Sequence, residues 1–170
     1  SEAARSFFDN AQEILDFDLK EMCFGEHEEL NLTEYTQPCM VSVCLAIVQE
    51  LKKRGINPDI TAGLSLGEYA AVAAAGGMNE LDAIKLVRRR GILMQSTVPA
   101  GEGAMAAVLG LDAKKIEEIL ESFENVWIAN YNCPGQIVIT GLTNEVQQAS
   151  LALKEAGAKR VVELKVSGPF

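Results

Sequence analysis

The chain has 170 residues, 48% of them hydrophobic, and a formal net charge of −9. This apolar content is enough for a buried core, and the negative charge argues against nucleic acid as a partner, because phosphate binding requires clustered positive charge. No uninterrupted apolar segment reaches the ~18 residues that span a membrane, and the N-terminus is polar and acidic. We therefore expect no membrane segment and no signal peptide, and a cytoplasmic location.

The first hundred residues carry mainly helical patterns. Apolar spacing predicts helices, in chain order, at residues 3–17, 40–51, 66–75 and 79–98. The segment 23–35 is acidic and typical of a loop. Residues 58–62 have the composition of a short strand that leads directly toward the third helix.

The pattern changes to short alternating elements after Pro99-Ala100-Gly101. The sequence predicts strands at 104–109, 126–131, 137–140 and 160–166, and helices at 113–123 and 144–156. This β-α-β-β-α-β order is that of a ferredoxin-like module. We therefore predict two units, an α/β unit over 1–101 and a small α+β unit over 102–166.

The four cysteines, Cys23, Cys39, Cys44 and Cys133, show neither paired metal-ligand spacing nor the pattern of a disulfide framework. We interpret them as ordinary thiols, and we expect no metal site. The single histidine, His27, is flanked by acidic residues and is interpreted as a surface residue.

The run Gly63-Leu64-Ser65-Leu66-Gly67 has the form of a nucleophile elbow. In such a turn a serine hydroxyl is held out of the backbone between a strand and a helix. Serine then needs a base to take its proton and donors for the oxyanion, and the N–H of Leu66 at the helix start is a natural donor. The alternative is a serine that merely caps an ordinary helix.

Five segments carry a more specific signal: Thr36-Gln37-Pro38, then residues 63–70, 90–95, 103–108 and 130–136. In this order and spacing they resemble the malonyl-CoA:acyl carrier protein transacylase family, over essentially the whole chain. Acyltransferase domains of polyketide and fatty acid synthases are similar too. The resemblance implies an α/β acyltransferase fold, with residues 1–101 in the large subdomain, 102–166 as the ferredoxin-like small subdomain, and 167–170 as the start of a return segment.

The resemblance also implies an activity. A malonyl group would pass from malonyl-CoA to the phosphopantetheine thiol of acyl carrier protein, through a serine ester, in fatty acid biosynthesis. Such a reaction uses no metal or redox cofactor. Acyl carrier protein and coenzyme A would be the partners.

Seven residues match functional positions of the family. Ser65 matches the nucleophile, Leu66 would give one backbone oxyanion donor, and Arg90 matches the arginine that holds the malonyl carboxylate. A guanidinium suits that task because its planar fork pairs two carboxylate oxygens at once. For Arg90, a salt bridge on a helix face stays an alternative.

The other four matches concern substrate binding. Met94, one helical turn after Arg90, would line the acyl pocket, or else belong to the core. Asn130 and Asn132 lie in a signature loop of the small unit, where they could instead satisfy their own backbone. Phe170 matches an aromatic position associated with malonyl over methylmalonyl selection.

The chain also departs from the family pattern. Leu64 stands where histidine is common, and the family's first strand, with its second oxyanion donor, is not found before Ser1. The segment 166–170 matches the approach to the catalytic histidine, which is not part of the sequence. We therefore expect a partial transacylase with little or no turnover by itself.

Three other functions stay open on the sequence. The chain could belong to a polyketide synthase acyltransferase, which runs the same chemistry. It could be a serine esterase, although such enzymes need a later histidine and an upstream donor loop. It could also be a non-catalytic piece that docks an acidic carrier protein through Arg88, Arg89, Lys159 and Arg160.

Overall fold

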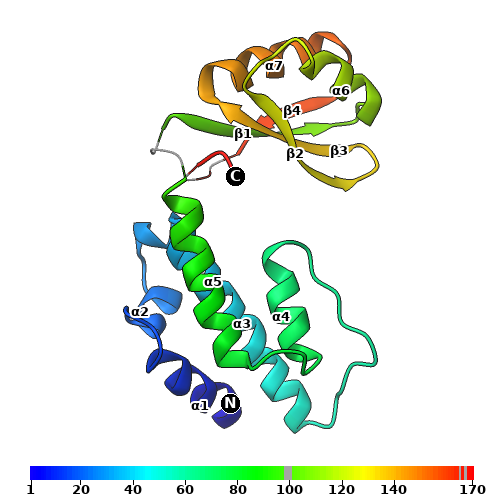
Figure 1. Cartoon of the computed structure of the whole chain (residues 1–170). Coiled ribbons are helices and arrows are strands. Elements are labelled where there is room, and N and C mark those ends of the chain that lie inside the picture. The colour runs from blue at the N-terminus through cyan, green and yellow to red at the C-terminus, as the bar shows by residue number, and fades with distance from the viewer. Residues whose placement is uncertain (98–100, 165, 167) are drawn as a thin grey trace. The chain divides into compact units, whose positions relative to one another are not determined.

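A computed structural model describes residues 1–97, 101–164, 166 and 168–170. The chain divides into two units, Ser1–Leu93 and Met94–Phe170, each with its own buried core (Figure 1). No helix among the described residues is long and apolar enough to cross a membrane.

The first unit is built from helices. They are α1 (Glu2–Gln12), α2 (Leu19–Phe24), the short 3-10 helix η1 (Glu28–Asn31), α3 (Thr33–Lys53), α4 (Leu66–Ala74) and α5 (Glu80–Gln95). Helix α3 is central, because α1, α2, η1 and α4 all contact it. Leu45 of α3 and Ile84 and Val87 of α5 are fully buried in the core of this unit.

Two expectations for this unit were wrong. The acidic segment 23–35 is not a simple loop: it contains the end of α2, the helix η1 and the start of α3. The Asp18 carboxylate accepts a hydrogen bond from the Glu21 N–H and so caps α2, a signal that apolar periodicity does not detect. The predicted strand at 58–62 is not formed among the described residues, because a strand requires a neighbour to pair with and all four strands lie in the second unit.

The second unit contains β1 (Gly103–Leu109), α6 (Ala113–Leu120), β2 (Val126–Cys133), β3 (Gln136–Leu142), α7 (Thr143–Glu155) and β4 (Arg160–Glu163). The strands form one sheet in the order β2-β3-β1-β4, with every neighbouring pair antiparallel. Helices α6 and α7 cover one face of this sheet (Figure 1). This arrangement confirms the predicted ferredoxin-like module.

Arg88 joins α5 to the segments around α3. Its guanidinium pairs with both carboxylate oxygens of Asp16, at 2.9 Å each, and with Glu34 at 3.0 Å. It also lies over the rings of Phe17 and Tyr35, 5.1 and 4.8 Å from their centroids. Arg88 is therefore committed to the fold, and the idea that it docks a carrier protein was wrong.

Arg88 also supplies a hydrogen bond that is missing within α3. Pro38 lies inside this helix and has no N–H, so it cannot bond the carbonyl of Glu34 one turn earlier. The NH1 group of Arg88 donates to that carbonyl at 2.8 Å. One side chain thus satisfies a backbone oxygen and two carboxylates.

Replacing Arg88 by methionine should lower the free energy of unfolding by about 2 kcal/mol, because it leaves carboxylates and a carbonyl without their donor. The hydrogen bond from Arg88 holds the pKa of Asp16 below its ordinary value. The Asp16 part of the stabilisation is therefore complete above pH ~4 and is lost as the pH falls through the lowered pKa. Urea unfolding at several pH values measures this, and Arg89→Met at the neighbouring exposed position should change stability by less than about 0.5 kcal/mol.

Ser42 carries an unsatisfied polar group in the core. It is fully buried on α3, and its hydroxyl has no hydrogen-bond partner among the described residues. An unpaired buried hydroxyl costs about 1–3 kcal/mol. Ser42→Ala should therefore raise the free energy of unfolding by about 1 kcal/mol in the same assay. No change or a loss would show that the hydroxyl has a partner, and Ser6→Ala on the exposed side of α1 serves as the control.

Candidate active site

Ser65 has a backbone conformation that side chains rarely adopt. Its φ is 51° and its ψ is −104°, and it is the one non-glycine residue with positive φ in the described part of the chain. Such a conformation costs about 1–3 kcal/mol and is found where function requires it. A strained serine immediately before a helix is one feature of a nucleophile elbow.

Gly63 makes this turn possible. A Cβ atom at position 63 would lie 2.1 Å from the carbonyl oxygen of Gly67 and 2.4 Å from the nitrogen of Glu68. The chain therefore folds back on itself so closely that only glycine fits there. Gly67 is different, because a Cβ added at that position meets nothing within 4 Å.

The Ser65 hydroxyl does not cap α4. Ser65 precedes the helix, yet its side chain makes no capping hydrogen bond. Its Oγ instead accepts a hydrogen bond of 2.9 Å from NH2 of Arg90. The capping alternative is therefore excluded. Leu66 is the first residue of α4, so its N–H is one of those that a helix start leaves without an intrahelical acceptor.

Arg90 carries a charge that no carboxylate compensates within the described residues. Its NH1 donates to Oε1 of Gln37 at 2.6 Å, its NH2 donates to Ser65, and its guanidinium lies 5.9 Å from the ring centroid of Tyr69. The salt-bridge alternative for Arg90 is thus wrong. A guanidinium held by neutral partners beside a serine hydroxyl can bind an anionic group next to the nucleophile.

The packing of α5 against α3 brings these residues together. A Cβ at Gly91 would lie 2.6 Å from the Cα of Glu34 and from the carbonyl oxygen of Thr33. The two helix backbones therefore touch at this point, and any larger residue would push them apart. Because Arg90 precedes this contact and Gln37 lies one turn beyond it on α3, their side chains meet.

Gln37 is a site residue to which sequence reasoning gave no role. It is 3% exposed, and it stands in a buried stretch of α3 that also includes Pro38 and Cys39. The signal that could have identified Gln37 is its polar amide beside apolar residues of a buried helix. A buried polar group needs a hydrogen-bond partner, and so it points to a second polar residue nearby.

The remaining predicted site residues are placed as follows. Met94 is half-buried near the end of α5. Asn130 and Asn132 lie on β2 and not in a loop, because β2 continues to Cys133 and pairs with β3, with two shifts of register between Ile128 and Cys133. Bulges re-aim side chains at such positions. Phe170 packs against a second hydrophobic cluster of the small unit, which is formed by Met105, Ala107 and Val138.

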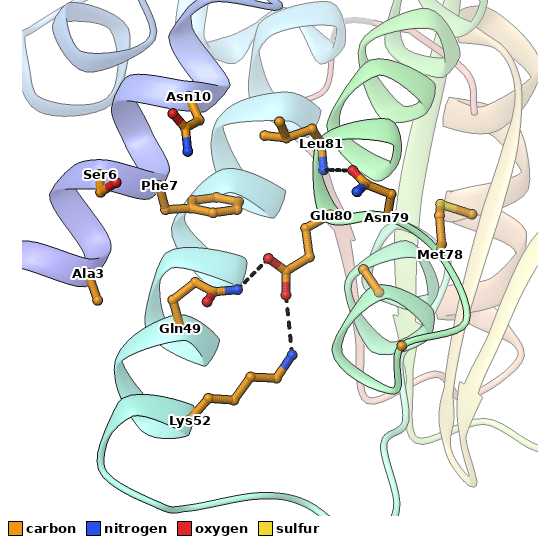
Figure 2. Close-up of a pocket in the computed structure, with 12 residues that line it drawn as sticks. Ala3, Ser6, Phe7, Asn10, Gln49, Lys52, Met78, Asn79, Glu80 and Leu81 are labelled. Carbon is orange, nitrogen blue, oxygen red and sulfur yellow. Dashed lines mark hydrogen bonds and ion pairs between the residues drawn. The ribbon is translucent and has the colours of Figure 1, made fainter.

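Other features of the described residues do not form a catalytic or metal centre. The Nε2 atom of His27 lies 3.2 Å from a carboxylate oxygen of Glu21, as a surface pair. No group of three or more potential metal ligands was found among the residues described. A cleft of about 550 Å³ lies beside Lys52 and Glu80, and neither Ser65 nor Arg90 lines it. Figure 2 shows the side chains around this cleft.

The comparisons agree with this geometry. Residues 3–168 match the acyl transferase domain family. The malonyl CoA-acyl carrier protein transacylase of Bacillus subtilis is 48% identical over 173 residues, which cover 99% of this chain and 55% of that protein.

Two solved structures are similar throughout the chain. The malonyl CoA-acyl carrier protein transacylase of Clostridium perfringens superposes with a TM-score of 0.92 at 42% identity, covering 99% of this chain and 54% of that one. A malonyl-transacylase in complex with a type II polyketide synthase acyl-carrier protein gives a TM-score of 0.93 at 40% identity, covering 99% and 56%.

The chain spans about half the length of the curated relatives it matches. Within that span, the family match includes Ser65, Arg90 and the whole ferredoxin-like module up to residue 168. The predicted resemblance is confirmed, and the chain belongs to the acyl transferase domain family.

Proposed function

We propose that this chain provides the nucleophile and the carboxylate-binding arginine of a malonyl transferase. The observation that carries the proposal is the uncompensated guanidinium of Arg90, 2.9 Å from the Ser65 hydroxyl. In a malonyl thioester a single methylene separates the carboxylate from the reacting carbonyl. A group that binds this carboxylate must therefore adjoin the nucleophile, as Arg90 does.

The proposed reaction has two steps. Ser65 Oγ attacks the thioester carbonyl of malonyl-CoA, loses its proton to a base, and forms an ester as coenzyme A leaves with a proton on sulfur. The phosphopantetheine thiol of acyl carrier protein then attacks the ester, and Ser65 regains its proton. The N–H of Leu66 stabilises the oxyanion in both steps. Neither step uses a metal or a redox cofactor.

The family resemblance supports further assignments. We assign residues 1–101 to the large acyltransferase subdomain, 102–166 to the small subdomain and 167–170 to the start of a return segment. Met94, Asn130, Asn132 and Phe170 are assigned to substrate binding. A methyl branch in an apolar pocket changes binding by about 1–3 kcal/mol, so Phe170 would bias malonyl selection without making it absolute.

Fatty acid biosynthesis is the proposed setting, because relatives of 43–48% identity are named malonyl CoA-acyl carrier protein transacylases. The relative solved with a polyketide carrier protein makes polyketide synthesis the second candidate. A simple esterase is disfavoured, because hydrolysis of neutral esters gives no role to an uncompensated guanidinium at the nucleophile.

Ser65→Ala should abolish acyl-enzyme formation, because alanine has no nucleophilic oxygen. The intact cellular protein that carries this sequence is incubated with malonyl-CoA, and peptide mass spectrometry locates the malonyl ester. We expect the label at Ser65 in the unmodified protein and none in the variant. A label on any other residue would contradict the nucleophile assignment.

Arg90→Ala should reduce malonyl transfer far more than acetyl transfer, because acetyl has no carboxylate to bind. Removing a charged pairing of this kind costs about 2–4 kcal/mol, which corresponds to a roughly tens- to several-hundred-fold loss in rate. The measurement compares kcat/KM for malonyl-CoA and acetyl-CoA in the intact protein. Equal losses for the two substrates would reject the carboxylate role, and Arg90→Lys tests whether charge alone suffices.

A further inference from the structure

The buried side chain of Gln37 is the middle link of a hydrogen-bond chain between Arg90 and Thr33. Its Oε1 accepts from NH1 of Arg90 at 2.6 Å, and its Nε2 donates to Oγ1 of Thr33 at 2.9 Å. Because Arg90 has only donors, the amide oxygen must face the guanidinium, and the amide nitrogen then faces Thr33. Both ends of the amide are thus used in one orientation.

An arginine that must bind a substrate needs its guanidinium fixed in advance. The side chain has several rotatable bonds, and ordering it at the moment of binding would reduce affinity. A hydrogen bond to a buried acceptor restricts the guanidinium, and here Arg90 donates it through NH1 to Gln37. NH2, which donates to Ser65, is on the side of the nucleophile.

The acceptor's lack of charge is the important chemical feature. A carboxylate in the same place would hold the guanidinium equally well, but it would neutralise the charge that attracts an anionic substrate. Arg88 illustrates that arrangement two residues earlier, where Asp16 and Glu34 occupy the guanidinium. Arg90 differs because its buried acceptor is an amide.

We propose that Gln37 is the positioning residue for Arg90, and that its neutral amide reserves the arginine's positive charge for the carboxylate of a dicarboxylic acyl group. Thr33 orients the Gln37 amide through its hydroxyl. This inference rests on the proposed malonyl transfer and adds a determinant of its substrate selectivity.

The test compares two substitutions at position 37 in the intact protein. Gln37→Met keeps the side-chain length and removes the acceptor, whereas Gln37→Glu keeps an acceptor and adds a negative charge. Both should lower kcat/KM for malonyl-CoA by roughly 10- to 100-fold and change kcat/KM for acetyl-CoA by less than about 3-fold. The loss of malonyl transfer in Gln37→Glu is the specific signature. If Gln37 only held the arginine side chain or the helix in place, glutamate would accept the same hydrogen bond and malonyl transfer would not fall.

Gln49→Met is the matched control. Gln49 lies on the same helix and donates a hydrogen bond to the carboxylate of Glu80, beside Lys52, at the cleft of Figure 2. Losing this hydrogen bond should lower the stability of the protein. The ratio of malonyl to acetyl transfer should stay within about 2-fold of that of the unmodified protein. Thr33→Val is a milder second variant, with an expected loss of roughly 2- to 5-fold for malonyl only.

Equal losses for malonyl and acetyl in Gln37→Met, or full malonyl transfer in Gln37→Glu, would overturn the proposal. If a thermal unfolding assay shows that the position-37 variants do not fold, the ratio of malonyl to acetyl transfer in Thr33→Val tests the proposal instead. Failure of the proposed function is recognised separately, because the unmodified protein would then fail to transfer malonyl at all.

Discussion

The contact between α5 and the start of α3 at Gly91 is the constraint on which the candidate site depends. The two backbones come so close that no side chain fits between them. This contact fixes where Arg90 meets Gln37. It also puts the guanidinium within hydrogen-bond reach of Ser65, which lies in the turn before α4. A helix pair separated by ordinary side chains would leave these polar groups apart.

Arg88 and Arg90 on α5 differ because the partners of their guanidinium groups differ in charge. Arg88 is neutralised by Asp16 and Glu34 and stabilises the fold. Arg90 is bonded by an amide and a hydroxyl, so its charge stays available to an anion. The charge of the partner thus decides whether a guanidinium is neutralised within the fold or stays available to an anion.

The turn at Ser65 shows how local strain and tertiary contacts cooperate. Ser65 has a positive φ and its hydroxyl does not cap the helix that follows, and Gly63 permits the close return of the chain. The hydrogen bond from Arg90 then holds the hydroxyl in place. A relaxed serine at this position would be free to cap α4.

The sequence by itself determined the ferredoxin-like module, the elbow motif and the helix at 66–75, because periodicity, turn residues and glycine spacing are local signals. It also predicted the helix at 79–98, which the structure gives as Glu80–Gln95, and the predicted end at Val98 lies outside the described residues. It did not determine that residues 58–62 lack a strand partner among the described residues, that Asn130 and Asn132 lie on β2, or that Asp16 and Glu34 neutralise Arg88. Nor did it give Gln37 a role. These features were decided by the tertiary structure, because strand pairing, burial and the charge of a partner depend on residues distant in the chain.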